Sequence, residues 1–263
     1  MFPARKRFES VDTNLGPSHD RRLAGSTRSK RATLALLGRF ELIDDGSTVP
    51  LAPASQRLLA YVALAGRRVR RDGVAGALWS VESEHRAHTN LRSAIARVGA
   101  RVPGLLYAVG AELALADTVS VDLDDARRVA LEVISRPAAT AIESAALSMS
   151  ALSAELLPGW YDDWVVNEAE LWRQQRLHAL EALSRVLTKA GRYAEAVVAA
   201  QAAVAGDPLR ESAQAALIAV HLREGNQSEA VRTFERYRSR LRDELGLEPT
   251  AQLRGQLGHG TIT

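Results

Sequence analysis

A stretch of 34 residues in the second half of the chain is repeated once, at positions 177–210 and again at positions 211–244. When the two copies are placed in register, Gly191 falls on Gly225. A repeated unit of this size cannot bury its apolar face alone, so neighbouring units have to stack. The repeat therefore predicts a stack of helices. The alternative is an ordinary bundle of helical hairpins whose sequence happens to repeat.

Small and apolar residues also recur at matching positions, since Ala196 falls on Ala230 and Leu183 falls on Leu217. A 34-residue period with small residues at these positions is the tetratricopeptide signature, in which each repeat is a pair of antiparallel helices. The glycines would close the turn within each pair, and the alanines would let the two helices approach closely. We therefore expect an all-α, tetratricopeptide-like domain in the second half of the chain.

Length and composition leave room for a second domain in the first half. The chain has 263 residues, of which 46% are hydrophobic and 25% are charged, as in ordinary soluble proteins. It contains no cysteine, which excludes disulfides and thiolate metal sites. No apolar run approaches the roughly 18 residues that span a membrane, and the N-terminus lacks the apolar core of a secretory signal. We therefore expect a cytoplasmic protein with no membrane partner.

Positive charge is concentrated at the N-terminus. Residues 1–31 contain eight Lys and Arg against three Asp and Glu, so this segment carries +5 while the whole chain carries +3. The segment has no periodic apolar face, which predicts a disordered basic tail. Such a tail is either a solvated leader or an arm that contacts phosphate without sequence preference. At the other end, residues 256–263 are expected to form a flexible tail.

Residues 32–120 contain signals for strands, then helices, then a hairpin. Two short strands are expected at residues 34–37 and 40–43, three helices at 54–65, 72–79 and 84–99, and a hairpin with strands at 105–109 and 113–115. This order is typical of a winged helix-turn-helix domain, whose third helix enters the major groove of DNA. The expected fold class is thus mainly α with small β: an N-terminal winged helix-turn-helix followed by the all-α helical domain.

The third helix has the composition of a DNA-contacting surface. From His85 to Arg101 the chain contains four arginines and no Asp or Glu. Apolar side chains at helical spacing, from Leu91 to Val98, must face the core. On the other face, Arg is suited to guanine, Asn to adenine, and Ser and Thr to phosphates or base edges. The candidate DNA-binding residues are Arg86, Thr89, Asn90, Arg92, Ser93 and Arg97. We expect Arg92 to read a base edge and Arg86 and Thr89 to bind phosphate. The alternative is that this face is only a solvated surface.

Signals for catalysis or metal binding are weak. The chain has no G-x-S-x-G, no glycine-rich phosphate loop and no H-E-x-x-H. His85 and His88 have a spacing that suits a metal, but no third ligand lies nearby in the sequence. The acidic clusters at 122–125 and 162–163 fall at expected helix starts, where Asp complements the helix dipole. We therefore expect no enzymatic activity, no cofactor and no metal.

Four aromatic residues lie close together in the second half of the chain: Trp160, Tyr161, Trp164 and Trp172. For Tyr161, Trp164 and Trp172 we expect core packing that joins the two domains. The alternative is an exposed patch that binds a partner.

Short segments in both halves resemble a known family. The first half resembles the OmpR-type winged helix of the Streptomyces antibiotic regulatory proteins in four places: residues 36–40 (Leu-Leu-Gly-Arg-Phe), Trp79, residues 90–94 (Asn-Leu-Arg-Ser-Ala) and residues 121–123 (Val-Asp-Leu). The second half resembles the bacterial transcriptional activator domain of that family in residues 157–165, 207–211 and 243–250. The resemblance covers about residues 33–254 and implies that residues 121–255 form that domain.

The resemblance implies a transcriptional activator that binds double-stranded promoter DNA at direct repeats. It implies recruitment of RNA polymerase through its sigma factor and core subunits, commonly for antibiotic biosynthesis genes, and hence association with the nucleoid. Direct repeats imply a homodimer with head-to-tail contact. The chain departs from the family at Ala96 and Gly99, where a bulky aromatic and a further basic residue are usual, and at Glu112 in the wing. The alternative function is a tetratricopeptide adaptor without specific DNA binding.

Overall fold

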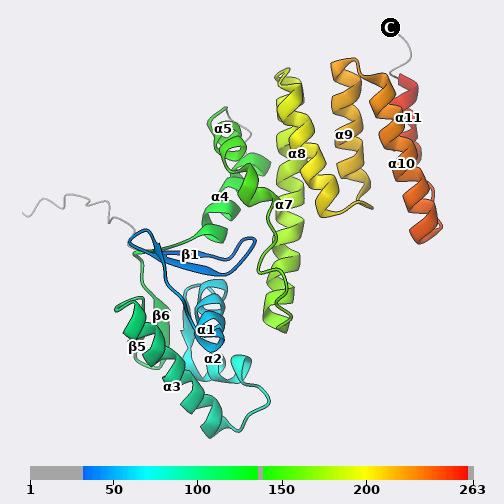
Figure 1. Ribbon diagram of the computed structural model, residues 1–263. Helices are drawn as coiled ribbons and strands as arrows, with labels where there is room; N and C mark the ends of the chain where they lie inside the picture. The colour runs from blue at the N-terminus through cyan, green and yellow to red at the C-terminus, as the bar shows by residue number, and fades with distance from the viewer. Residues whose placement is uncertain (1–31, 136–138, 260–263) are drawn as a thin grey trace, which may run out of the picture.

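The computed structural model describes residues 32–135 and 139–259 (Figure 1). The expected basic tail at residues 1–31 lies outside the described residues, as do the last four positions of the expected C-terminal tail. The fold is mainly α with two small sheets, as the sequence predicts. Within the part of the chain that the structure describes, no helix is both long and apolar enough to cross a bilayer.

The N-terminal part begins with three strands, β1 (Ala32–Ala35), β2 (Glu41–Asp44) and β3 (Ser47–Thr48). Three helices follow, α1 (Pro53–Leu64), α2 (Arg71–Leu78) and α3 (Glu84–Arg101), with the short strand β4 (Arg68–Arg70) between the first two. Proline in the first turn of α1 suits the helix start, because its missing N–H has no partner there anyway. The part closes with β5 (Leu106–Val109), β6 (Glu112–Leu115) and β7 (Val119–Val121).

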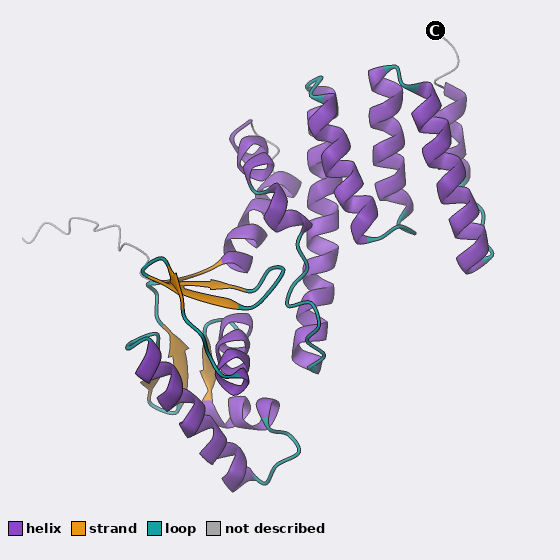
Figure 2. Ribbon diagram, in the orientation of Figure 1, coloured by secondary structure: helices purple, strands orange, loops and turns teal. Residues whose placement is uncertain are grey.

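The strands form two separate sheets (Figure 2). The first has the order β3-β2-β1-β7, with β1 antiparallel to β2 and parallel to β7. The second has the order β4-β6-β5 and is antiparallel throughout. The expected strands and final hairpin are therefore present, whereas β3, β4 and β7 were not predicted. Strand β3 has only two residues. Strands β4 and β7 have three residues each, so pairing with distant strands, and not their own pattern, makes them strands.

The helical part follows β7 without a linker. It comprises α4 (Asp122–Ser135), α5 (Ala139–Leu147), α6 (Met149–Ser153), α7 (Asp163–Lys189), α8 (Tyr193–Gly206), α9 (Glu211–Glu224), α10 (Gln227–Leu245) and α11 (Ala251–His259). Helices α7 to α10 stand side by side in sequence order, and α11 contacts α9 (Figure 1). Residues 256–259, expected within a flexible tail, are the last turn of α11, because Leu253 and Leu257 pack onto the neighbouring helices.

The predicted repeat positions occupy equivalent places in the stack. Gly191 lies between α7 and α8 at φ 74°, and Gly225 lies between α9 and α10 at φ 86°, in the left-handed region that favours glycine. Ala196 and Ala230 are fully buried where the helices of each pair meet. The tetratricopeptide-like arrangement expected from the 34-residue period is thus present.

Hydrogen bonds between two backbone segments join the N-terminal part to the helical part. The N–H of Leu157 donates to the Leu36 carbonyl at 2.9 Å, and the N–H of Gly38 donates to the Glu155 carbonyl at 2.7 Å. The carboxylate of Asp122, at the start of α4, accepts the N–H groups of Leu36 and Leu37 at 2.8 and 3.1 Å. One apolar core therefore runs without interruption from the first sheet into the helical stack.

Aromatic side chains also pack at the junction between the two parts. The predicted core packing holds for all of the residues named for it except Tyr161. Trp160 and Trp164 lie at the junction, where Trp164 meets Tyr61 of α1 edge-on with ring centroids 5.2 Å apart. Trp172 is fully buried in α7. The expectation for Tyr161 was wrong, because its side chain is 87% exposed. The backbone turns at Gly159, which has φ 83°, so Trp160 points inward and Tyr161 points to solvent.

Candidate nucleic-acid interface

Helix α3 packs on the N-terminal core along one side only. Leu91, Ala94 and Val98 are buried, and Ile95 is half-buried against the same core. These positions share one face because they are three or four residues apart. The opposite face is exposed, and from His85 to Arg101 it carries no acidic side chain. The helix therefore presents an arginine-rich surface along its length.

The structure places the six predicted site residues on or beside this exposed face. Five of them are exposed: Arg86, Thr89, Arg92, Ser93 and Arg97. Asn90 is half-buried at the flank of the face, next to the buried stripe. The six positions lie within three turns of α3, so a groove that accepts this helix would meet them together.

Short-range contacts hold part of this face in the free protein. The Thr89 hydroxyl donates to the His85 carbonyl at 2.9 Å, and Nη2 of Arg92 donates to Oγ1 of Thr89 at 3.0 Å. Nη1 of Arg86 lies 3.8 Å from Oε2 of Glu82, which precedes the helix. Exposed ion pairs of this length contribute little and exchange readily for a phosphate. The arginines are thus available to a polyanion.

The second histidine of the helix, His88, faces α2. Nε2 of His88 lies 3.7 Å from Oδ1 of Asp72, and Nη2 of Arg70 lies 3.8 Å from the other oxygen of Asp72. His85, one turn earlier in the helix, is exposed. Across residues 32–135 and 139–259, no three His, Asp or Glu side chains gather into a group that would hold a metal ion.

The unpredicted strand β4 brings two further arginines to the wing formed by β5 and β6. Arg68 pairs with Glu112, and Arg70 lies opposite Glu112 in the strand register. The Arg71 N–H donates to the Ala111 carbonyl at 3.0 Å, which fixes the wing tip to the start of α2. The negative charge of Glu112 is therefore compensated. Alternation of Arg, Val and Arg over three residues was the only sequence signal for this strand.

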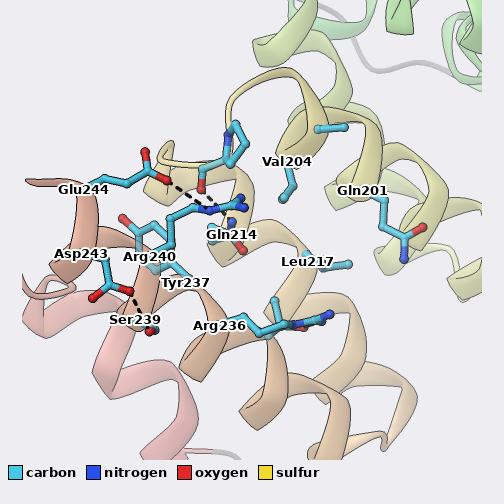
Figure 3. A pocket seen from close by; sticks show the side chains of 13 residues that line it. Gln201, Val204, Gln214, Leu217, Arg236, Tyr237, Ser239, Arg240, Asp243 and Glu244 are labelled. Atoms are coloured by element: carbon cyan, nitrogen blue, oxygen red, sulfur yellow. Dashed lines mark hydrogen bonds and ion pairs between the residues drawn. The ribbon is translucent and has the colours of Figure 1, made fainter.

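A second candidate site lies in the helical stack (Figure 3). It is a groove of about 710 Å³ between α8, α9 and α10, with Arg236, Tyr237 and Arg240 on one wall and Gln201 on the other. Arg240 pairs with Glu244 at 3.4 Å, and Gln214 donates to the Pro208 carbonyl at 2.9 Å. Grooves of this kind in helical repeats hold extended peptides.

The sequence matches known proteins in both parts. A family model described as the bacterial transcriptional activator domain matches residues 121–257, which is just over half of the chain. Transcriptional regulator RedD of Streptomyces coelicolor is 40% identical over 86 residues, which cover 33% of this chain and 25% of RedD. Regulatory protein AfsR of the same organism is 28% identical over 223 residues, which cover 81% of this chain and 22% of AfsR. The chain thus spans about a quarter of the length of these relatives or less.

The fold also has a solved counterpart. The structure of Mycobacterium tuberculosis EmbR, in complex with a low affinity phosphopeptide, aligns with a TM-score of 0.68 and 24% identity over 89% of this chain and 65% of EmbR. At this identity the likeness shows the fold alone. A winged helix joined to a stack of helical repeats, with regulators as its relatives, defines a transcriptional regulator. Through its bacterial transcriptional activator domain, the chain belongs to the Streptomyces antibiotic regulatory protein family of transcriptional activators.

Proposed function

We propose that this protein activates transcription by binding double-stranded promoter DNA through α3. The observation that carries the proposal is the exposed, acid-free arginine face of that helix, whose other side is anchored in the core. Arg92 and Asn90 have the chemistry to read base edges, and Arg86 and Thr89 have the chemistry to bind phosphates. Ser93 and Arg97 extend the same surface toward the C-terminal end of the helix.

The wing supplies a second contact in this proposal. Arg70 is exposed beside the wing tip, and Tyr107 of β5 is 44% exposed. A guanidinium and a phenol hydroxyl both donate to phosphate oxygens. These residues would position the protein on the duplex while α3 reads the sequence.

The helical part is the proposed contact for RNA polymerase, including its sigma factor, and for a second copy of the chain. Two copies bound at direct repeats would meet head to tail, and occupying both repeats gains affinity through effective concentration when the copies touch. The family to which the chain belongs is that of antibiotic regulatory proteins, so the proposed targets are genes of secondary metabolism, with the protein acting at the nucleoid. We also propose residues 32–120 and 121–255 as the DNA-binding and activator domains.

The test is binding of the full chain to labelled DNA from upstream of the genes that adjoin its own. We expect tighter binding to one such fragment than to a scrambled duplex, with affinity that falls as salt rises because phosphate contacts release counterions. Footprinting should then show two half-sites in the same orientation. Retention that is equal on both DNAs, or absent at moderate salt, would contradict the proposal.

The groove between α8, α9 and α10 supports a second function, that of a peptide-binding adaptor (Figure 3). The two functions make different forecasts for α3. An adaptor would keep its partner when Arg92 and Arg97 are both replaced by alanine, whereas the DNA-binding activator would lose promoter occupancy. Chromatin immunoprecipitation of the double variant distinguishes them.

A further inference from the structure

A second pocket, of about 350 Å³, lies between the segment that precedes α7 and the first half of that helix. Its walls are mostly apolar and aromatic, with Leu157, Trp160 and Trp172 on the inside and Tyr161 and Val166 at the exposed rim. Pockets of this size and character suit small molecules with an apolar body. The pocket is separate from α3 and from the groove in the helical repeats.

A buried arginine lines this pocket. Arg176 of α7 is only 2% exposed, yet its five N–H donors have few acceptors. Nη1 donates to the Ser153 carbonyl at 3.3 Å, and Nη2 lies 4.0 Å from Oε1 of Glu155. Nε has no hydrogen-bond partner within the described part of the chain. A buried guanidinium normally has its donors satisfied, so Arg176 lacks an acceptor that its position calls for.

The residues around the Arg176 guanidinium leave room for it but do not compensate its positive charge. A methyl group at Gly206 would lie 3.0 Å from Nη1 of Arg176 and 2.7 Å from Cδ2 of Leu177, so glycine at the end of α8 leaves room for the guanidinium. Burial lowers the pKa of Arg176, which means that the charged form is under-solvated where it lies. A bound anion would supply the missing interaction.

The other charged groups of the pocket are already solvated or paired. Glu155 and Glu170 are exposed at its edge, and Arg173 donates to Glu170 and to Asp207 at 2.8 Å each. Hydrogen bonds from Arg173 and Gln174 lower the pKa of Glu170 to about 2, so that carboxylate stays ionised and bound to its neighbours. Glu155 is therefore the nearest competitor for Arg176, and as an exposed side chain at 4.0 Å it is readily displaced.

We propose that this pocket binds a small organic carboxylate with an aryl or alkyl body, whose carboxylate meets Arg176 while its apolar body packs against Trp160 and Tyr161. Arginine pairs with carboxylates through two parallel N–H donors, and such charge-assisted bonds are strongest where water is excluded. The volume limits the ligand to a molecule of about a dozen non-hydrogen atoms. Binding at this place is independent of the proposed DNA binding.

The experiment compares two probes of the same shape, 4-phenylbutyrate and its neutral amide 4-phenylbutyramide, on the full chain without DNA. Trp160, one of the four tryptophans, is half-buried at the pocket and reports binding by its fluorescence. We expect the acid to bind at least about tenfold more tightly than the amide, because only the acid pairs with Arg176. Equal affinity of the two probes, or no saturable response to the acid, would overturn the proposal.

Substitutions in and near the pocket test whether the two probes bind there. Arg176→Met keeps the length of the side chain without its charge, and it should remove the preference for the acid while leaving amide binding unchanged. Arg185→Met changes an exposed arginine of the same helix and should alter neither affinity. Should Arg176→Met fail to fold, Val166→Trp at the rim should block both probes by filling the entrance. An acid preference that survives in folded Arg176→Met, or probes that still bind Val166→Trp, would contradict the assignment.

Discussion

Phe40 stacks on Trp160 with ring centroids 5.9 Å apart and planes inclined by 22°. Phe40 follows β1, whereas Trp160 comes shortly before α7, so this pair connects the two parts of the chain across 120 positions of sequence. The N-cap of α7 is tied to the same place, because Arg57 of α1 pairs with Asp162. The junction between the two parts is therefore held by both aromatic packing and an ion pair.

Loss of the stack should destabilise the whole chain. We expect Trp160→Ala to lower the free energy of unfolding by about 1–3 kcal/mol, because the removed ring is half-buried against Phe40 and Trp164. Urea denaturation measures this change. The matched control is Tyr161→Ala, which removes an exposed ring one position away and should stay within about 0.5 kcal/mol of the unmodified chain. Similar losses in the two variants would mean that the two side chains are placed wrongly.

Substitution of Arg86, at the start of α3, and of Arg92, in its middle, should affect DNA binding in different ways. Arg92→Ala should weaken operator binding by about 1–3 kcal/mol and relax the preference at one base pair, because a base contact is lost. Arg86→Ala should weaken binding to all DNA alike and reduce the salt slope by about one. Anisotropy titrations on operator and scrambled DNA across a salt series measure both. Arg232→Ala, in the helical stack, is the control, and equal losses on both DNAs for Arg92→Ala would refute its role in reading sequence.

Gly99 weakens α3 without an evident structural need. It lies in the last turn of the helix, and a methyl group built there meets nothing within 4 Å. Gly99→Ala should therefore raise the stability of the protein by up to about 1 kcal/mol, visible as a higher Tm. Ala96→Gly, on the same exposed face, should lower it by a similar amount. A lower Tm for Gly99→Ala would reveal a constraint on the helix that the free structure does not display.

Tyr237 makes the stability of the helical stack sensitive to alkaline pH. Burial and the nearby Glu211 carboxylate raise the pKa of its phenol from 10.0 to about 12. The neutral phenol is therefore favoured in the folded state, and stability is retained below pH 10 and falls as pH rises through 10 toward 12, where the unfolded chain loses its proton first. Tyr237→Phe should remove this part of the decline. Urea midpoints of both proteins between pH 8 and about pH 12 test it, and parallel curves would count against it.

The boundary between the proposed domains falls inside a strand. Leu34 of β1 pairs with Val121 of β7, and Asp122 accepts the N–H groups of Leu36 and Leu37, just after β1. A fragment of residues 30–120 lacks both partners. It should bind promoter DNA but melt at a lower temperature than a fragment of residues 30–125. Full transcriptional activation by either fragment alone, in a reconstituted assay, would remove the proposed role of the helical part.

The sequence predicted the elements whose signal is local. The 34-residue period placed Gly191 and Gly225 in their turns, because a tight turn between helices restricts the backbone at one position. The spacing of Leu91 and Val98 located the buried face of α3, because that face repeats every three to four residues. The short strands β4 and β7 escaped prediction, since distant partners define them.

The direction in which a side chain points was the second feature that the sequence could not predict. Trp160 and Tyr161 are adjacent aromatics with the same apparent chemistry, yet after the turn at Gly159 Trp160 is half-buried and Tyr161 is exposed. Arg176 had no sequence signal at all, because an arginine in a long helix is usually a solvated one. Its burial follows from the packing of α6 and α8 against α7, which no pattern in the sequence specifies.

The position of β1 in its sheet bears on how the chain folds as it leaves the ribosome. This strand is among the first of the described residues to be made, and it can pair with β2 at once. Its other edge has to wait for β7, and its C-terminal extension has to wait for residues 155–157. An unpaired strand edge is a template for association with other chains. Until residues 119–121 and 155–157 have been made, that edge of the nascent protein is therefore open to pairing with a wrong partner.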